Sequence, residues 1–314
     1  MLTSLGKKAF AWASAIDPWT NVYGVARTCL ALGTLATLLF SPADALFRPG
    51  TGIFEAPICR GISQVSLFCF LPGHLELARW VAIGLLAVIA SGWRPRITGI
   101  IHWWLSSGLF TSALLVDGGD QVTAVLTLLL LPVTLMDKRR WHWDSVEPSP
   151  AASPREVYLR LIALSCLVVV RVQVAGIYYQ AAVSKFGVPE WANGTALYYW
   201  LTDPLFGVPS WLEPAVMPLL ISGTTVVILT WGVLLVESLL FTGLVMDKRG
   251  WPYLLKVGIV FHIGIAVCQG LGSFVLAMSG ALILFLRPVN QPFELAFFRR
   301  AKWRLASLRA GKRS

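Results

Sequence analysis

The residues of this sequence whose types could do chemistry are ionisable side chains inside apolar segments. Arg171, Tyr178 and Lys185 follow one another at seven-residue spacing, so a helix places all three on one face. Charged side chains at membrane depth are costly and mark either functional sites or compensated pairs. An amine held partly out of water is a candidate base, because burial favours its neutral form. The alternative for Lys185 is an anchor that extends to the lipid headgroups.

Further ionisable groups lie at similar depth. Glu237 falls within reach of a long arginine side chain, so we predict that Arg171 and Glu237 form a structural charge pair. His262 lies in the middle of an apolar run, where it is either a hydrogen-bonded packing residue or a proton acceptor near neutral pH. Asp117-Gly-Gly-Asp120 precedes another apolar run and fits both an ordinary turn and a polar group lining a cavity.

The chain has five cysteines. Cys59 and Cys69 share one loop on a side predicted to be oxidising, where a disulfide and two free thiols are equally compatible with the sequence. Cys29, Cys166 and Cys268 fall in or at the ends of apolar runs, as small apolar residues commonly do. No Cys/His spacing matches a zinc or haem site, so we expect no metal.

The elements that must position these residues are membrane helices. Of 314 residues, 56% are hydrophobic and 13% are charged, with a mean hydropathy of +0.68. Soluble domains carry about 25% charged residues. The net charge of +10 comes from basic residues between apolar runs, which indicates membrane topology rather than a nucleic-acid partner. The composition predicts an all-α, multi-pass protein of the cell membrane, embedded in the lipid bilayer.

Apolar runs predict a polytopic bundle of about eight transmembrane helices. The predicted spans are 22–40, 75–91, 97–116, 120–136, 157–185, 214–246, 252–269 and 271–287. The last two are expected to be joined by a tight turn at 269–272, because its glycines free the backbone. Twenty Lys and Arg residues then fall on the side of the two termini, and only Arg48, Arg60 and Arg79 fall on the other. Because basic loops stay in the cytoplasm, both termini are predicted to be cytoplasmic.

Three segments follow from this topology. They are a cytoplasmic N-terminal segment at 1–20, a transmembrane domain at 21–290, and a basic amphipathic cytoplasmic tail at 291–314 that is expected to lie on the membrane surface. Outer loops are predicted at 41–74 and 186–213. The second contains Trp191 and other aromatic residues that could cover a cavity. Inner residues 137–156 are proline-rich and predict a flexible linker.

Several strings in the chain also carry a family resemblance. They are Asn21-Val-Tyr-Gly-Val-Ala-Arg27, Ile101-His-Trp-Trp104, Asp117-Gly-Gly-Asp120, Trp141-His-Trp143, Ala182-Val-Ser-Lys-Phe186, Phe261-His262 and Gly272-Ser-Phe-Val275. Together they resemble the sporulation-delaying protein B family of membrane proteins, which are used in making a secreted peptide toxin. That family is grouped with the horizontally transferred transmembrane (HTTM) domain and is related to the vitamin K-dependent γ-carboxylases.

The resemblance implies site residues. The carboxylase lysine proposed to deprotonate vitamin K hydroquinone maps onto Lys185, and the Phe-His and Ser-Phe strings map onto His262 and Phe274. Lys185 and His262 are thus the candidate catalytic residues. Where the carboxylases have a functional histidine, this chain has Asp120, which joins Tyr178, Trp191 and Phe274 as candidate cavity or substrate-binding residues.

Three functions fit these expectations. The first is maturation of a secreted antimicrobial peptide toxin, at an outward-facing polar site that acts on a membrane-associated pro-peptide together with a small partner membrane protein. The second is a carboxylase-like enzyme that uses a quinone or vitamin K hydroquinone as cofactor. The third is a transporter or toxin-immunity protein. Transport predicts polar residues through the full depth of the bundle and broken helices, and an ATP-driven pump is excluded because the chain has no phosphate loop.

Overall fold

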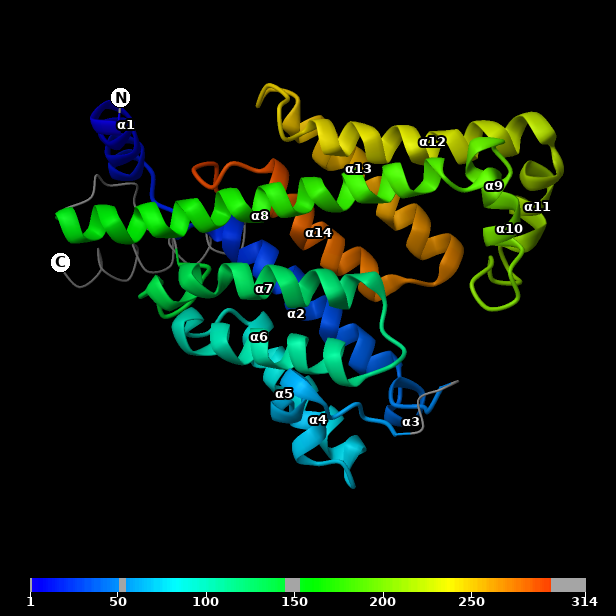
Figure 1. Ribbon diagram of the computed structural model, residues 1–314, viewed down its shortest axis with the longest axis horizontal. Coiled ribbons are helices and arrows are strands. Elements are labelled where there is room, and N and C mark those ends of the chain that lie inside the picture. Colours follow the sequence, from blue (N-terminus) through cyan, green and yellow to red (C-terminus); the bar gives the residue numbers. More distant parts are fainter. Residues whose placement is uncertain (1, 51–54, 145–152, 295–314) are drawn as a thin grey trace, which may run out of the picture.

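The computed structural model describes residues 2–50, 55–144 and 153–294, and within these ranges it is helical throughout apart from loops and one isolated bridge between Trp93 and Trp141 (Figure 1). The first half contains α1 (Leu2–Ala15), α2 (Asn21–Phe40), α3 (Ala43–Leu46), the 3-10 helix η1 (Gly61–Val65), α4 (Leu67–Phe70), α5 (Leu75–Ala90), α6 (Pro95–Ser112) and α7 (Gly118–Met136). The second half contains α8 (Pro154–Phe186), α9 (Pro189–Ala192), α10 (Ala196–Leu201), α11 (Glu213–Ile221), α12 (Gly223–Thr242), α13 (Trp251–Gln269) and α14 (Gly272–Leu286).

Five of the described helices are long and apolar enough to cross a membrane, namely α2, α7, α8, α12 and α13. The other three predicted spans correspond to α5, α6 and α14. The helices α5 and α14 have 16 and 15 residues. The expected all-α class is confirmed, and so is the presence of several helices fit for a membrane.

The helix α14 lies at the centre of the bundle and packs most extensively against α2. From Ala277 onward its side chains are almost all buried. A Cβ at Gly280 would lie 2.7 Å from the Ala26 carbonyl oxygen and 3.2 Å from Cys29 Cβ, both on α2. Small residues therefore let the two backbones approach closely, as in many membrane helix pairs.

Two predicted spans have different boundaries in the structure. The helix α8 contains the whole predicted span 157–185 but extends to 33 residues, about 50 Å at 1.5 Å per residue. The predicted span 214–246 is not one helix, because the backbone becomes extended at Ser222 and separates α11 from α12. Hydropathy is continuous through this break, so the apolar run alone could not locate it. The predicted glycine turn at 269–272 is confirmed, with Gly270 in the left-handed region at φ 74°.

The start of the predicted flexible linker is well packed. Residues 137–144 fold back onto the turn between α5 and α6, where Arg94 N donates to Arg140 O at 2.7 Å and His142 N donates to Gly92 O at 3.0 Å. The prediction was wrong for this part because it was based on the prolines that follow at 148–154, whereas residues 145–152 lie outside the described residues.

The two terminal segments are described in part. The N-terminal segment forms α1, which packs against α8. The predicted amphipathic tail lies outside the described residues from position 295 onward. Its first residues contact the start of α2, because Phe293 N donates to Asn21 Oδ1 and Asn21 Nδ2 donates to Phe293 O, each at 2.8 Å.

Candidate functional site

The strongest polar contact between membrane helices joins Lys185, in the last turn of α8, to Glu237 on α12. Lys185 Nζ lies 2.7 Å from Glu237 Oε1 and 2.8 Å from Oε2, and it also donates to Ala181 O at 3.1 Å. An ammonium group has three N–H donors, so these three acceptors satisfy it fully. Glu237 is 7% exposed and the Lys185 side chain 22%. Lys185 therefore does not extend to the headgroups as an isolated anchor.

The predicted Arg171–Glu237 pair is not formed. Arg171 lies 14 residues before Lys185, about 21 Å lower along α8, so Glu237 cannot serve both cations. The Arg171 guanidinium instead lies over the Trp251 ring, 3.9 Å from its centroid. This cation–π contact compensates its partial burial. The prediction assumed that the inner ends of the two spans lie at the same depth, whereas Glu237 lies beside the last turn of α8.

A short helical segment after α8 covers the ion pair. Trp191 on α9 is buried, and Lys185 Nζ lies 5.2 Å from the centroid of its ring. The chain then turns at Gly194, whose φ is +83° and whose added Cβ would lie 2.8 Å from Val227 on α12. Glycine there allows α9 and α10 to pack closely on α12. Trp191 therefore lies against the ion pair, in the loop whose aromatic residues are expected to cover a cavity.

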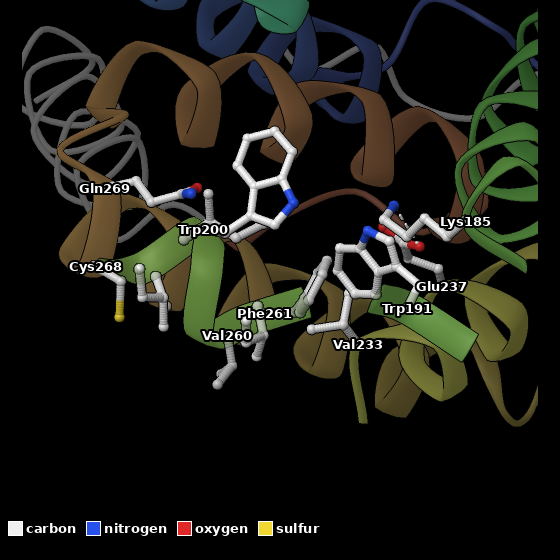
Figure 2. Close-up of a pocket in the computed structure, with 13 residues that line it drawn as sticks. Lys185, Trp191, Trp200, Val233, Glu237, Val260, Phe261, Cys268 and Gln269 are labelled. Carbon is white, nitrogen blue, oxygen red and sulfur yellow. Dashed lines mark hydrogen bonds and ion pairs between the residues drawn. The ribbon is translucent and has the colours of Figure 1, made fainter. Parts of the chain in front are cut away.

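Beside the ion pair is an apolar pocket of about 440 Å³. Its lining comes from α8, α9, α10, α12 and α13 and consists of Lys185, Trp191, Leu197, Trp200, Leu201, Val233, Glu237, Val260, Phe261, Gly264, Ile265, Cys268 and Gln269. Figure 2 shows Lys185, Glu237 and Trp191 at one end, with Cys268 and Gln269 at the other. The pocket thus offers a long apolar wall that ends at a paired charge.

Several residues that line the pocket were not predicted from the sequence as site residues. The α13 members Phe261, Gly264, Ile265 and Cys268 recur at intervals of three and four, which is the spacing of one helix face. That signal was present in the sequence, but it could not be distinguished from ordinary packing. Trp200 could be recognised only as one of many aromatics in its loop.

His262, Tyr178 and Phe274 form an aromatic cluster beside the pocket residue Phe261. The ring centroids of His262 lie 6.0 Å from Tyr178 and 5.5 Å from Phe274. His262 Nδ1 lies 2.7 Å from Gly258 O, and the buried Tyr178 hydroxyl has no hydrogen-bond partner among the described residues. The structure therefore brings together five of the predicted residues, Lys185, Trp191, Tyr178, His262 and Phe274, but only the first two line the pocket.

Asp120 belongs to a separate polar cluster. Thr37 donates to its Oδ2 at 3.0 Å, while Asp117 caps α7 and accepts a hydrogen bond from Ser273 at 2.7 Å. Phe274 lies against Gly118 on one side and His262 on the other, so it separates this cluster from the aromatic group. Asp120 is buried but does not line the pocket.

The structure contains a disulfide between Cys59 and Cys69, which joins the segment before η1 to α4. The three remaining cysteines are free, and Cys268 lies at the far end of the pocket. Among the described residues no group of His, Cys, Asp and Glu could hold a metal ion.

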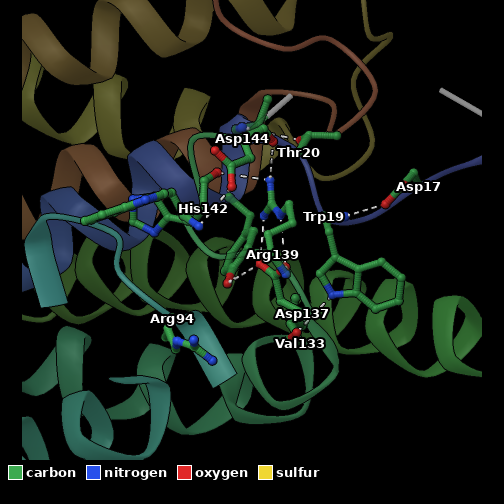
Figure 3. A network of polar contacts seen from close by, with 12 residues as sticks. Asp17, Trp19, Thr20, Arg94, Val133, Asp137, Arg139, His142 and Asp144 are labelled. Carbon is green, nitrogen blue, oxygen red and sulfur yellow. Dashed lines mark hydrogen bonds and ion pairs between the residues drawn. The ribbon is translucent and has the colours of Figure 1, made fainter. Parts of the chain in front are cut away.

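Sequence reasoning missed a second charged network where α7 ends (Figure 3). Arg139 donates to both oxygens of Asp137 at 2.9 and 2.7 Å, and Tyr23 donates to Oδ2 at 3.2 Å. Burial opposes the charged form of Arg139, but the Asp137 carboxylate more than offsets this and raises its pKa. Burial, together with the charge of Arg27, holds the pKa of His142 well below its usual range.

Fold and pocket together define a helical membrane protein with an apolar pocket beside an ion pair that joins two long apolar helices. The chain is 38% identical over 306 residues to the uncharacterized protein YitO of Bacillus subtilis (strain 168), covering 96% of each chain. It is 37% identical over 278 residues to the sporulation-delaying protein SdpB of the same organism, covering 88% of this chain and 84% of SdpB. The chain belongs to the family of sporulation-delaying protein SdpB. No protein-family model and no solved structure matches it.

Proposed function

We propose that this protein is an integral membrane factor for the maturation of a secreted antimicrobial peptide toxin. Its pocket receives an apolar segment of a membrane-associated pro-peptide, and a small partner membrane protein assists. Kinship with SdpB supports the toxin context. The observation that carries the proposal is the Lys185–Glu237 ion pair in the wall of an otherwise apolar pocket.

The chemistry of the pocket suits a ligand that arrives from the bilayer. Val260, which lines it, is 67% exposed on α13, and the apolar side chains of Val257, Ile263 and Val267 are exposed on the same helix. Such a surface faces lipid. A hydrophobic peptide segment can therefore enter sideways between α12 and α13, with its backbone polar groups near Glu237, Lys185 and Gln269. Unpaired peptide groups are costly in a membrane, so these polar side chains supply the partners.

The roles of Lys185 and His262 in this site are part of the proposal. In the ion pair Lys185 is an ammonium whose three N–H groups are all bound, so it has no lone pair to accept a proton. It could act as a base toward a substrate only after passing one of its own protons to an acceptor such as Glu237. The carboxylase-like alternative needs the same free amine, and the pocket offers no feature that selects a quinone over a peptide.

The pocket would open toward the outer leaflet. We propose eight spans, formed by α2, α5, α6, α7, α8, α12, α13 and α14, with both termini in the cytoplasm. The distribution of basic residues supports this topology.

The topology is tested at two equally exposed positions, Leu205 and Val245, each 86% exposed. In a background without free cysteines, an impermeant thiol reagent should label Leu205→Cys but not Val245→Cys in intact cells. The reverse pattern would invert the topology.

The function is tested by deleting the gene for this chain in its own host and restoring variants. Mass spectrometry of the culture medium, and growth inhibition of a sensitive lawn, should show a peptide that disappears on deletion and returns with the wild-type chain. Lys185→Arg should abolish it at normal protein abundance, because the larger planar guanidinium does not fit the three acceptors of the ammonium. Unchanged secreted peptides after deletion would refute the proposal.

A further inference from the structure

A second feature of the bundle concerns Arg27, a buried arginine that lacks a counter-ion. Arg27 lies on α2, about 9 Å from its first residue, and is 1% exposed. It donates one hydrogen bond, from Nη2 to Thr98 Oγ1 on α6 at 2.7 Å. Its Nε and Nη1 atoms are buried with no partner. Within the described part of the chain, no carboxylate forms an ion pair with it.

The neighbouring carboxylate is already neutralised. Asp137 faces Tyr23, which is one helical turn before Arg27, but both oxygens of Asp137 are held by Arg139. The cluster of Arg27, Arg139 and Asp137 therefore carries one net positive charge. An uncompensated buried ion costs several kcal/mol, so a compensating charge is expected.

His102 on α6 adds a second unpartnered group. It is 1% exposed, and its Nε2 atom has no hydrogen-bond partner. The unpartnered hydroxyls of Ser106 and Thr123 carry less weight, because a hydroxyl can rotate to a backbone carbonyl one turn earlier. A guanidinium has only donors and a fixed shape, so the N–H groups of Arg27 require an external acceptor.

The size of that acceptor is limited by close helix contacts nearby. A Cβ on Gly24 would lie 2.8 Å from the His142 carbonyl oxygen, and one on Gly99 would collide with the Thr134 side chain. Gly24 lies three residues before Arg27, and Gly99 lies three residues before His102. Only a small acceptor fits such a packed region.

We propose that Arg27 and His102 form a buried site for a small monovalent anion of the size of chloride. The anion accepts hydrogen bonds from Nε and Nη1 of Arg27 and from Nε2 of His102. It supplies the negative charge that the cluster lacks and stabilises the contact of α2 with α6. This site is distinct from the Lys185–Glu237 pocket, so it does not depend on the proposed toxin function.

The test is thermal unfolding of the purified full-length protein in detergent, followed by tryptophan fluorescence. Sodium chloride is exchanged for sodium gluconate at constant ionic strength, so that screening is unchanged. A bound anion should raise the unfolding temperature by several degrees in a saturable manner, because a ligand that binds the folded state stabilises it. Bromide should replace chloride, and sulfate should not.

Three variants complete the test. Arg27→Gln should lose the chloride dependence, and in gluconate it should be at least as stable as the wild type because the uncompensated charge is gone. Arg171→Gln is the matched control, which should keep the full chloride shift because its cation lies over Trp251. Thr98→Val removes the hydrogen bond that orients Arg27 and should weaken chloride binding. It replaces Arg27→Gln in the test if that variant does not accumulate.

Two results would overturn the proposal. One is a wild-type protein with equal unfolding temperatures in chloride and gluconate, and the other is a chloride shift that is retained in Arg27→Gln and Thr98→Val.

Discussion

Two regions of the bundle hold a buried carboxylate–cation pair, and their surroundings differ. At the Lys185–Glu237 pair the adjoining pocket is apolar and lies among α10, α12 and α13. At the Arg139–Asp137 pair the adjoining hollow, of about 410 Å³, is lined mainly by charged and polar side chains such as Asp17, Lys138 and Arg155. The apolar pocket suits an apolar ligand, whereas the polar hollow suits water.

The difference also concerns the backbone. Arg139 binds not only Asp137 but also the carbonyl oxygens of His142 and Asp144, at 3.0 and 3.1 Å, so its charge holds a folded-back loop together. The Lys185 ammonium holds one carbonyl in its own helix and one carboxylate on α12. The open apolar space beside the Lys185–Glu237 pair, rather than the presence of an ion pair, is therefore what distinguishes it as the candidate site.

The largest expected effect is on stability at the second pair. Asp137→Ala leaves the buried Arg139 guanidinium without its carboxylate and Tyr23 without its acceptor. We expect a loss of about 3–5 kcal/mol in unfolding free energy, measured by thermal unfolding. Toxin output should fall only in proportion to the remaining folded protein. A greater loss of toxin per folded molecule would mean that this network also takes part in function.

At the first pair we expect Lys185→Met to lower the unfolding free energy by a smaller amount, about 2–3 kcal/mol. The loss is smaller than for a fully buried pair because the lysine is partly exposed. The double variant Lys185→Met with Glu237→Leu should recover most of the unfolding temperature without restoring toxin output. Recovery of both would make the pair purely structural, contrary to the proposed site.

The pH dependence of stability should come from the second region. Because burial lowers the pKa of His142, the unfolded chain binds its proton first as the pH falls below about 6.5. Stability from this residue is thus complete above pH 6.5 and decreases below it, by at most about 1.4 kcal/mol per pH unit. Unfolding temperatures at pH 7.5 and 5.5 should show this decrease in the wild type and a flatter profile in His142→Gln. Equal slopes would exclude His142 as the source.

The smallest stability effect is expected at the rim of the pocket. Trp200 is half exposed, so Trp200→Ala should change the unfolding free energy by less than about 1 kcal/mol while lowering toxin output. Trp211→Ala is the matched control, because Trp211 is 70% exposed in the same loop and does not line the pocket. Similar toxin output from the two variants would indicate that the pocket does not bind the peptide.

The sequence alone determined the all-α class, the apolar helices and the glycine turn at 269–272. These are local properties, since hydropathy, glycine conformation and residue type act within one segment. The seven-residue spacing correctly placed Lys185 and Tyr178 on one helix, and Phe261-His262 identified a residue beside the pocket.

Only the tertiary structure decided which groups meet. Glu237 pairs with Lys185 rather than Arg171 because α8 and α12 pack so that Glu237 lies beside the last turn of α8. The relative depth of two helices depends on packing against their neighbours, which an apolar run does not encode. The same reason hid the Arg139–Asp137 network, whose members come from a loop that looked flexible. It also hid the position of Arg27, which binds Thr98 one helical turn from His102 on α6 and has no ion-paired carboxylate among the described residues.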